Sequence, residues 1–317
     1  LNLLNSYKAG SIVVMNIENG HVLCMASTPS YNPNKIVTKP NKEYWDSILK
    51  NKLSPMTFRS VQGLYAPGST FKMIVAIAGL YYGAIDGNTN HFCNGKISLG
   101  ERLYHCWKNN GHGLMNIERA IQESCDIFFY EISKKIGIDK ISKVAKDFGL
   151  GKVYDIPLNN QKVGIVPSKK WKKDNLGESW YPGETLISAI GQGFVLANPL
   201  QLANMTSIIA SEGKIVEPKI INDGNLNSFE ILKKYEQSIK IVKKSMFKVV
   251  NEYKGTAYKS KSDDIKFSGK TGTSQVRRIT VEERESEDFR KKEVEWEKRD
   301  HALFVGYMPH DKPKYSI

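Results

Sequence analysis

Short runs rich in apolar and β-branched residues lie near the two ends of the chain, and polar turn residues bound them, which is typical of β-strands. The turn signal Glu18-Asn19-Gly20 separates the first two runs and predicts a hairpin. Strands are expected at residues 11–17, 21–26, 267–276, 302–307 and 314–317.

The middle of the chain instead shows apolar residues at the three- and four-residue spacing of helices. Residues 71–80 are apolar almost all the way round, which is typical of a helix buried in a core, and we expect this helix to end near Gly83. Asn116 is an N-cap residue type at the start of a helical pattern that is interrupted at residues 124–126. Further helices are expected at residues 139–148, 199–212 and 229–253.

The remaining segments lack clear periodicity. We expect loops with one short helix over residues 28–60, irregular structure over 84–115 and a loop-rich stretch over 151–184. Residues 277–300 contain 17 charged residues of 24, eight basic and nine acidic. Such a mixed charge run is typical of solvated surface, so we expect a charged surface excursion there.

The order of elements indicates one α+β domain over residues 1–317, in which the N- and C-terminal strands form an antiparallel sheet covered by the helical middle. The chain starts and stops abruptly, and we interpret it as a fragment truncated at its C-terminal end. The sequence contains no apolar run of 18 residues, so it predicts no transmembrane helix within residues 1–317.

The chain is basic, with 46 Lys and Arg against 33 Asp and Glu, a formal charge of +13 and a pI of about 9.3. A basic balance is compatible with nucleic acid, an anionic membrane surface or an acidic substrate. The lysines are scattered, however, and no arginine-rich stripe with interleaved aromatic residues is present. The composition therefore does not favour a nucleic-acid partner.

The first candidate chemistry is the pair Ser69 and Lys72, which begins the apolar run. Helical spacing places side chains three residues apart on one face. A lysine inside a buried helix must be paired or neutral, and beside a serine hydroxyl a neutral lysine is a general base next to a nucleophile. The alternative is that Ser69 is an ordinary N-cap and that Lys72 reaches solvent.

Two later motifs strengthen the catalytic interpretation. Ser124-Cys125-Asp126 supplies a hydroxyl and a carboxylate at the helix interruption, 55 residues after Ser69. Lys270-Thr271-Gly272-Thr273 follows after another 146 residues and places an ammonium group, two hydroxyls and a glycine on a predicted strand. Such a strand can bind a substrate carboxylate and allow a close backbone approach. Each motif alone is weak evidence for a catalytic site, but the order of the three motifs and the distances between them in sequence make the combination specific.

With these three motifs the chain resembles the penicillin-binding transpeptidases and serine β-lactamases. The resemblance covers nearly the whole chain and is closest to the elongation-specific class B penicillin-binding proteins of the penicillin-binding protein 2 type. Residues 65–72, Trp107-Lys108, Gly111-His112-Gly113 and Gly191-Gln192-Gly193 also match. The third residue of the middle motif is Asp126, where most relatives carry Asn and the elongation type commonly carries Asp. A division-specific transpeptidase is the closest alternative, and Asp126 argues against it.

The resemblance implies a β-lactamase/transpeptidase-like fold and a role for each motif residue. Ser69 would attack the D-Ala-D-Ala carbonyl of a peptidoglycan stem peptide, Lys72 would take its proton, Ser124 would relay a proton to the leaving amine, and Asp126 would orient Lys72. Lys270, Thr271 and Thr273, beside Gly272, would bind the substrate carboxylate. The backbone N–H groups of Ser69 and Thr273 would form the oxyanion hole, and β-lactams would acylate Ser69.

Two other functions share these motifs. A serine β-lactamase needs a group that activates a deacylating water, and Glu178 and Glu184 keep that alternative open. A non-catalytic β-lactam sensor or scaffold would bind partners without turnover. The resemblance favours the transpeptidase over both.

A second constellation comprises Cys93, Cys106, His112 and Cys125. Three thiolates and an imidazole form a zinc-ligand set, although the spacing is not that of a compact finger. Alternatively Cys93 and Cys106 form a disulfide, Cys125 is a small buried residue, and His112 is a hydrogen-bonded polar residue. The remaining cysteine, Cys24 in the first hairpin, is expected in the core.

The resemblance favours zinc, because elongation-type transpeptidases can carry a zinc site in this segment. The metal would be structural, since four protein ligands fill its coordination sphere. The resemblance further implies β-lactam antibiotics as ligands, a SEDS-type membrane glycosyltransferase as a partner, and a catalytic domain in the periplasm attached to the bacterial inner membrane. The membrane anchor and the pedestal domain would lie outside this chain.

Overall fold

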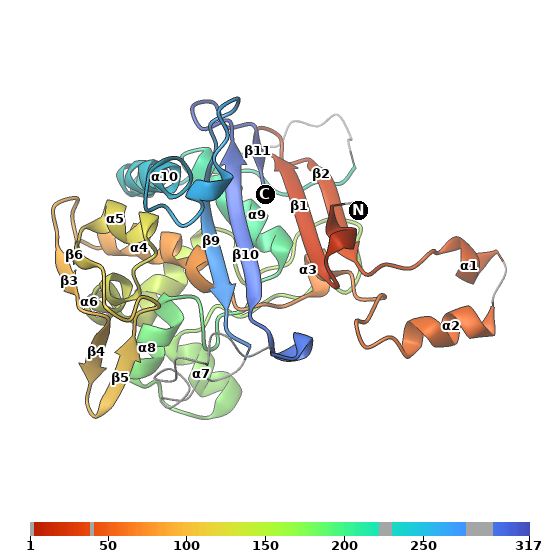
Figure 1. The fold of residues 1–317 in the computed structure, drawn as a ribbon, viewed down its shortest axis with the longest axis horizontal. Helices are drawn as coiled ribbons and strands as arrows, with labels where there is room; N and C mark the ends of the chain where they lie inside the picture. The colour runs from red at the N-terminus through yellow and green to blue at the C-terminus, as the bar shows by residue number, and fades with distance from the viewer. Residues whose placement is uncertain (1–2, 39–40, 222–229, 277–293) are drawn as a thin grey trace.

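The computed structural model describes residues 3–38, 41–221, 230–276 and 294–317. Its main sheet has five antiparallel strands in the order β2-β1-β11-β10-β9 (Figure 1). These strands are β1 (Gly10–Asn16), β2 (Val22–Thr28), β9 (Ser268–Ser274), β10 (His301–Met308) and β11 (Tyr315–Ser316). The predicted sheet of N- and C-terminal strands is therefore confirmed.

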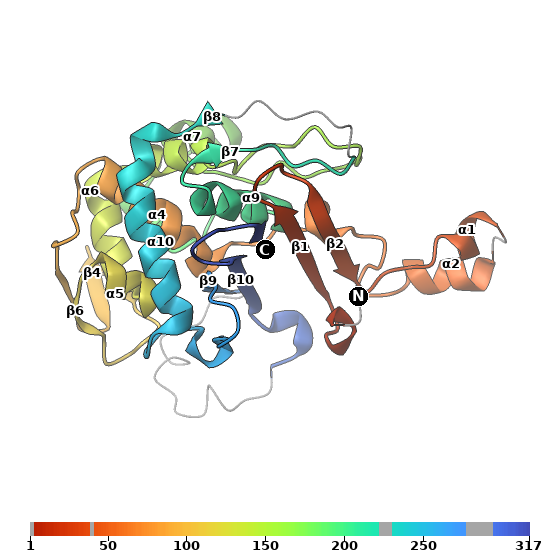
Figure 2. The ribbon, with the colours of Figure 1, turned by 90° about the horizontal axis from the view of Figure 1, so that it is seen from above.

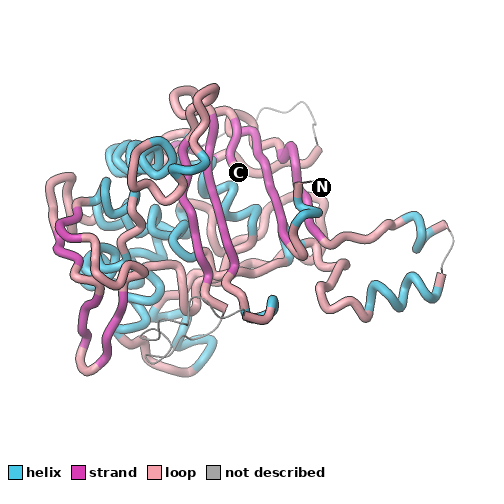
Figure 3. Tube along the Cα trace, viewed as in Figure 1, coloured by secondary structure: helices cyan, strands magenta, loops and turns pink. Residues whose placement is uncertain are grey.

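Ten α-helices are described, all of them between β2 and β9 along the chain; Figure 3 shows the helices in cyan and the strands in magenta. They are α1 (Asn34–Val37), α2 (Lys42–Leu49), α3 (Arg59–Gln62), α4 (Lys72–Tyr81), α5 (Ile117–Gln122), α6 (Asp126–Asp147), α7 (Lys169–Leu176), α8 (Pro182–Ala189), α9 (Pro199–Ala210) and α10 (Glu236–Asn251). Helix α9 packs on β1, β10 and β11, and α10 packs on β9. Helices α1 and α2 project away from the rest of the molecule (Figure 2).

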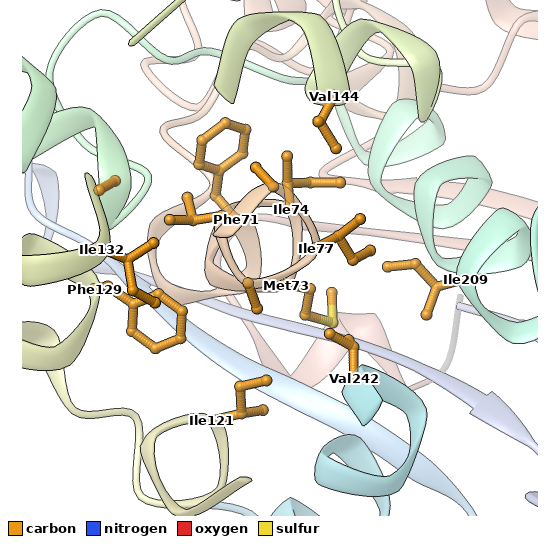
Figure 4. Packing of buried hydrophobic residues seen from close by; sticks show 14 of the residues in the cluster. Phe71, Met73, Ile74, Ile77, Ile121, Phe129, Ile132, Val144, Ile209 and Val242 are labelled. Atoms are coloured by element: carbon orange, nitrogen blue, oxygen red, sulfur yellow. The ribbon is translucent and has the colours of Figure 1, made fainter. Parts of the chain in front are cut away.

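Helix α4 is the centre of the core. Its residues from Lys72 to Gly79 are all buried, and α5, α6, α9 and α10 surround it (Figure 4). Ile121, Phe129, Val144, Ile209 and Val242 pack around it from these four helices. Full burial of each such side chain stabilises the fold by about 1.5–3 kcal/mol. An all-round apolar helix predicted this position correctly.

Helix α5 begins where the sequence indicated, because the Asn116 side chain accepts a hydrogen bond from the Arg119 N–H. After the interruption at residues 124–126, α6 continues to Asp147 with a kink at Gly137, where φ is 72° and ψ is 164°. The second half of α6 is the helix expected at residues 139–148.

Three segments are more regular than expected. Residues 28–60 contain α1, α2 and the start of α3, and residues 151–184 contain α7 and the start of α8. Residues 84–115 contain β3 (His91–Cys93), β4 (Lys96–Leu99), β5 (Arg102–His105) and β6 (Gly113–Met115), paired as β3-β6 and β4-β5. Strands of three or four residues are too short to show a period in sequence.

Two smaller differences concern the C-terminal half. The helix expected from residue 229 begins at Glu236, after the short strand β8 (Glu230–Ile231), which pairs with β7 (Lys214–Ile215). Of the charged run at residues 277–300, positions 277–293 lie outside the described residues. The described remainder contains a 3-10 turn at Trp296–Lys298.

We expect Gly137→Ala to lower the free energy of unfolding by about 1–3 kcal/mol, because its backbone conformation is one that side-chain-bearing residues avoid. Gly87→Ala is the matched control, since Gly87 also has open space at its Cβ position but an ordinary φ. Urea unfolding of both variants measures the difference. Equal stability of the two would contradict the assignment of strain to Gly137.

Candidate active site

Ser69 lies in a 3-10 turn, Gly68–Phe71, that leads directly into α4. Ser69 is half-buried, whereas Lys72, the first residue of α4, is fully buried. The sequence predicted a helix across both residues, and the structure places them one helical turn apart with Ser69 toward the surface. The alternative in which Lys72 reaches solvent is excluded by its burial.

The Lys72 ammonium group is bound by the middle motif. Its Nζ donates to Asp126 Oδ1 at 2.6 Å, to the Ser124 carbonyl at 2.9 Å and to Ser124 Oγ at 3.3 Å. Within the described part of the chain, none of its hydrogen bonds goes to Ser69. Catalytic hydrogen bonds are commonly loose in ligand-free enzymes and tighten when substrate binds.

Lys270, the first residue of the third motif, also binds the Ser124 hydroxyl. It is fully buried on β9, and its Nζ donates to Ser124 Oγ at 3.0 Å and to the Thr271 carbonyl at 3.0 Å. Burial, reinforced by the nearby charge of Lys72, lowers the pKa of Lys270 well below its usual value. The Ser124 hydroxyl thus lies between two lysines and is suited to pass a proton between them.

Asp126 supplies the negative charge of this cluster at the first residue of α6, where the helix dipole favours a carboxylate. Its Oδ2 accepts from the Trp107 backbone N–H at 2.8 Å, and its Oδ1 accepts from Lys72. Burial raises the pKa of Asp126, and the Lys72 charge opposes that rise. Ser124 itself has a left-handed φ of 56°, which costs energy in a residue with a side chain.

The remaining residues of the third motif lie along β9. Gly272 is buried against Thr70, Thr271 is half-buried, and Thr273 is exposed. The Thr271 hydroxyl is 2.6 Å from the Thr256 hydroxyl. The structure therefore joins four motif residues by hydrogen bonds into one cluster: Lys72, Ser124, Asp126 and Lys270. Gly272 and Thr273 lie beside the turn that carries Ser69.

The cysteine and histidine set also converges. Cys93, Cys106, His112 and Cys125 are all buried, and their ligand atoms lie within 4.8 Å of one another. All four cysteines are free, so the predicted alternative of a Cys93–Cys106 disulfide is wrong. Cys24 was expected in the core, but it is exposed, because it lies on β2 at the edge of the sheet.

The three thiols of the cluster differ in the direction of their pKa shifts. Hydrogen bonding to Cys106 lowers the pKa of Cys93 to about 3, hydrogen bonding to Cys125 lowers that of Cys106, and the same contacts raise the pKa of Cys125. His112 Nδ1 lies 3.4 Å from Cys106 Sγ and 3.6 Å from Cys93 Sγ. Buried thiolates packed this closely favour a bound cation.

Comparison with known proteins identifies the family. The family described as penicillin binding protein transpeptidase domain matches residues 10–317. The chain belongs to this family. Its relatives and structural neighbours place it in the penicillin-binding protein 2 branch of the class B proteins.

Among curated proteins, the chain is 33% identical to the peptidoglycan D,D-transpeptidase MrdA of Acinetobacter baumannii, over 98% of this chain and 47% of that protein. It is 34% identical to MrdA of Haemophilus influenzae, over 99% of this chain and 50% of that protein. The chain therefore spans about half the length of these relatives.

Among solved structures, penicillin-binding protein 2 of Helicobacter pylori in complex with MreC superposes with a TM-score of 0.90 at 33% identity, over 99% of this chain and 56% of that one. Penicillin-binding protein 2 of Pseudomonas aeruginosa, in complex with WCK 5153, superposes with a TM-score of 0.85 at 32% identity, over 99% and 69%. The β-lactamase/transpeptidase-like fold expected from the sequence is confirmed.

Three backbone segments of this transpeptidase domain meet at the Ser69 turn. The Gly68 N–H donates to the Gly191 carbonyl at 2.9 Å, and Gln192 Nε2 donates to the Thr273 carbonyl at 3.1 Å. A Cβ on Gly68 would lie 2.4 Å from the Thr273 carbonyl oxygen. Sequence reasoning quoted residues 191–193 only as a family marker and missed this structural role. Two glycines flanking one glutamine were the available signal.

We expect Gly68→Ala to slow the reaction of Ser69 with penicillin by about a hundredfold, because the clash pushes Thr273 away by roughly 1 Å. Gly83→Ala is the control, since Gly83 has a similar positive φ of 68° but open space around its Cβ position. Labelling rates with a fluorescent penicillin compare the two. Equal rates would show that close packing at Gly68 does not matter for reactivity.

Proposed function

We propose that this chain is the catalytic domain of a peptidoglycan D,D-transpeptidase that cross-links stem peptides during cell elongation. The observation that carries the proposal is a buried cluster in which Lys72 and Lys270 both donate hydrogen bonds to the Ser124 hydroxyl. Lys72 also donates to Asp126 and lies one helical turn from Ser69. The names of the relatives agree with this activity.

The reaction begins with attack of Ser69 Oγ on the carbonyl carbon of the penultimate D-alanine of a stem peptide, while Lys72, in its neutral amine form, takes the hydroxyl proton. The backbone N–H groups of Ser69 and Thr273 bind the oxyanion, and one such donor is worth about 3 kcal/mol. The amide bond then breaks. Ser124 passes a proton to the leaving amine, and free D-alanine departs from the acyl-enzyme.

The second half of the reaction forms the cross-link. An amine of a neighbouring stem peptide attacks the ester carbonyl and loses its proton through Ser124 and Lys72. The ester bond breaks, and the Ser69 hydroxyl is restored. Lys270, Thr271 and Thr273 would hold the terminal carboxylate of the donor peptide by hydrogen bonds.

A β-lactamase needs a free group to activate water, and the two glutamates considered for this role are engaged elsewhere. Glu184 Oε1 is 2.6 Å from the buried Lys172 Nζ, and Glu178 Oε2 is 3.2 Å from the same atom. Glu184 Oε2 also accepts from the Tyr181 N–H and caps α8. Both carboxylates thus bind Lys172 and stabilise the segment before Gly191. Because neither is free to activate a deacylating water, slow deacylation is expected, which favours a transpeptidase over a β-lactamase.

Penicillin should add one covalent adduct to the chain at Ser69, stable over hours, because no glutamate of this pair is free to hydrolyse the ester. Ser69→Ala should abolish the adduct, while Ser54→Ala, a change at an exposed serine, should keep it. Intact-mass spectrometry measures both. Undiminished labelling of the Ser69 variant would refute the nucleophile, and loss of the adduct within seconds would indicate a β-lactamase.

We further propose that Cys93, Cys106, His112 and Cys125 hold a structural zinc ion. A tetrahedral zinc with one nitrogen and three sulfur ligands has nitrogen-to-sulfur distances of about 3.6 Å, close to the 3.4 and 3.6 Å from His112 Nδ1. The donor set therefore fits zinc without an open position. Bound there, the ion would fix Cys125, and with it the positions of Ser124 and Asp126 on either side.

The purified chain should contain about one zinc ion, and Cys106→Ser should lose it and react more slowly with penicillin, because a four-ligand site loses one thiolate. Cys24→Ser is the control, since Cys24 is exposed and outside the cluster. Elemental analysis and penicillin labelling measure the two effects. A metal-free wild-type chain, or equal zinc in both variants, would refute the site.

The parent protein would be a longer, membrane-anchored synthase of which residues 1–317 form the transpeptidase domain, with an anchor and a pedestal outside this chain. None of the helices in the described part of the chain is both long and apolar enough to cross a membrane. The relative from Helicobacter pylori was solved with MreC. We propose an MreC-type scaffold and a SEDS-type glycosyltransferase as partners of the parent protein, acting in the periplasm.

A further inference from the structure

Trp107 is half exposed, yet the polar atom of its ring is used inside the protein. The exposed fraction of the residue is 53%. Its indole Nε1 donates to the Ser124 carbonyl at 3.1 Å and to the Glu123 carbonyl at 3.2 Å. A tryptophan retained only for core packing would bury its ring. The contacts of Trp107 therefore indicate a role at residues 123 and 124.

The position of Trp107 is itself fixed on both sides. Its backbone N–H donates to Asp126 Oδ2 at 2.8 Å, and its ring packs edge-on against His112 with centroids 5.4 Å apart. The preceding residue, Cys106, belongs to the thiol cluster and donates its N–H to the Gly95 carbonyl at 2.7 Å. The indole N–H therefore approaches Ser124 from a rigid support.

Ser124 needs such support because its φ of 56° is unfavourable for a residue with a side chain. The peptide carbonyl of Ser124 accepts from Lys72 Nζ at 2.9 Å and from the indole. A rotation of this peptide would move the Ser124 hydroxyl away from Lys72 and Lys270, which lie 3.3 and 3.0 Å from it. The two donors on the carbonyl hold the hydroxyl in place.

The two donors differ in one respect. Lys72 gains and loses a proton during the proposed reaction, so its hydrogen bonds change in number through the cycle. The indole N–H does not titrate in water near neutral pH. It is the donor on the Ser124 carbonyl that stays the same in every step.

We propose that Trp107 is a positioning residue for the reaction: its indole N–H holds the Ser124 carbonyl and thereby keeps the Ser124 hydroxyl between the two lysines while Lys72 exchanges its proton. This inference rests on the proposed function. It predicts an effect on the rate of the chemical step and not on the binding of substrate or metal.

Trp107→Phe removes the indole N–H and leaves the backbone bond to Asp126. We expect the first-order rate constant of acylation by penicillin to fall about tenfold, with an unchanged dissociation constant of the preceding complex, unchanged metal content and a melting temperature within about 2 °C of wild type. Replacement of Trp107 by 3-benzothienylalanine, which keeps the bicyclic shape and lacks the N–H, should give the same loss. Trp45→Phe, on the projecting α2, should react like wild type.

Stopped-flow acylation kinetics at several penicillin concentrations separates the rate constant from the dissociation constant. Wild-type rate constants in both Trp107 variants would overturn the inference while leaving the transpeptidase assignment standing. A loss with phenylalanine but not with benzothienylalanine would also overturn it, because ring shape and not the N–H would then matter. A wild-type chain that penicillin does not acylate would overturn the proposed function and this inference with it.

Discussion

The placement of two lysine side chains around one serine hydroxyl is the constraint on which the rest of the structure depends. Lys72 and Lys270 are both fully buried, and the carboxylate that pairs with Lys72 is Asp126. Removing an ionised side chain from water costs several kcal/mol, and a hydrogen-bonded partner of opposite charge only partly offsets this. The fold must therefore supply both the stability and the exact set of polar contacts that make such a cluster possible.

Stability comes from the helices around α4, which carries Lys72 at its first residue and is otherwise apolar over its buried length. The lysine thus begins the helix at the centre of the core. Its ammonium group turns toward residues 124–126, where the break between α5 and α6 leaves a carbonyl, a hydroxyl and a carboxylate within reach. A continuous helix at this point would have used the Ser124 carbonyl internally, so the interruption is part of the site.

The sequence predicted the motif residues, the sheet and the helices α4, α5, α6, α9 and α10 of the core, because each depends on local patterns or on motif spacing. It could not predict contacts between distant backbones. That Gly68 lies against Thr273 and Gly191 follows from how β9 and the α8–α9 turn pack, and a glycine alone does not show which segment approaches it. The short strands β3–β6 escaped prediction because three or four residues are too few to show a period in sequence, and because β3 and β6 pair beside the cysteine and histidine cluster.

The same long-range packing explains why residues 124–126 are held by three different parts of the molecule. The left-handed conformation of Ser124 costs about 1–3 kcal/mol and persists only where its surroundings over-determine it. Cys125 is buried in the thiol cluster, Asp126 is bound by Lys72 and the Trp107 backbone, and the Ser124 carbonyl accepts from Lys72 and the Trp107 indole. Cys106 and Trp107 are adjacent, as are Ser124 and Cys125. Any group that fixes the thiol cluster therefore also fixes the geometry of the proton-transferring serine.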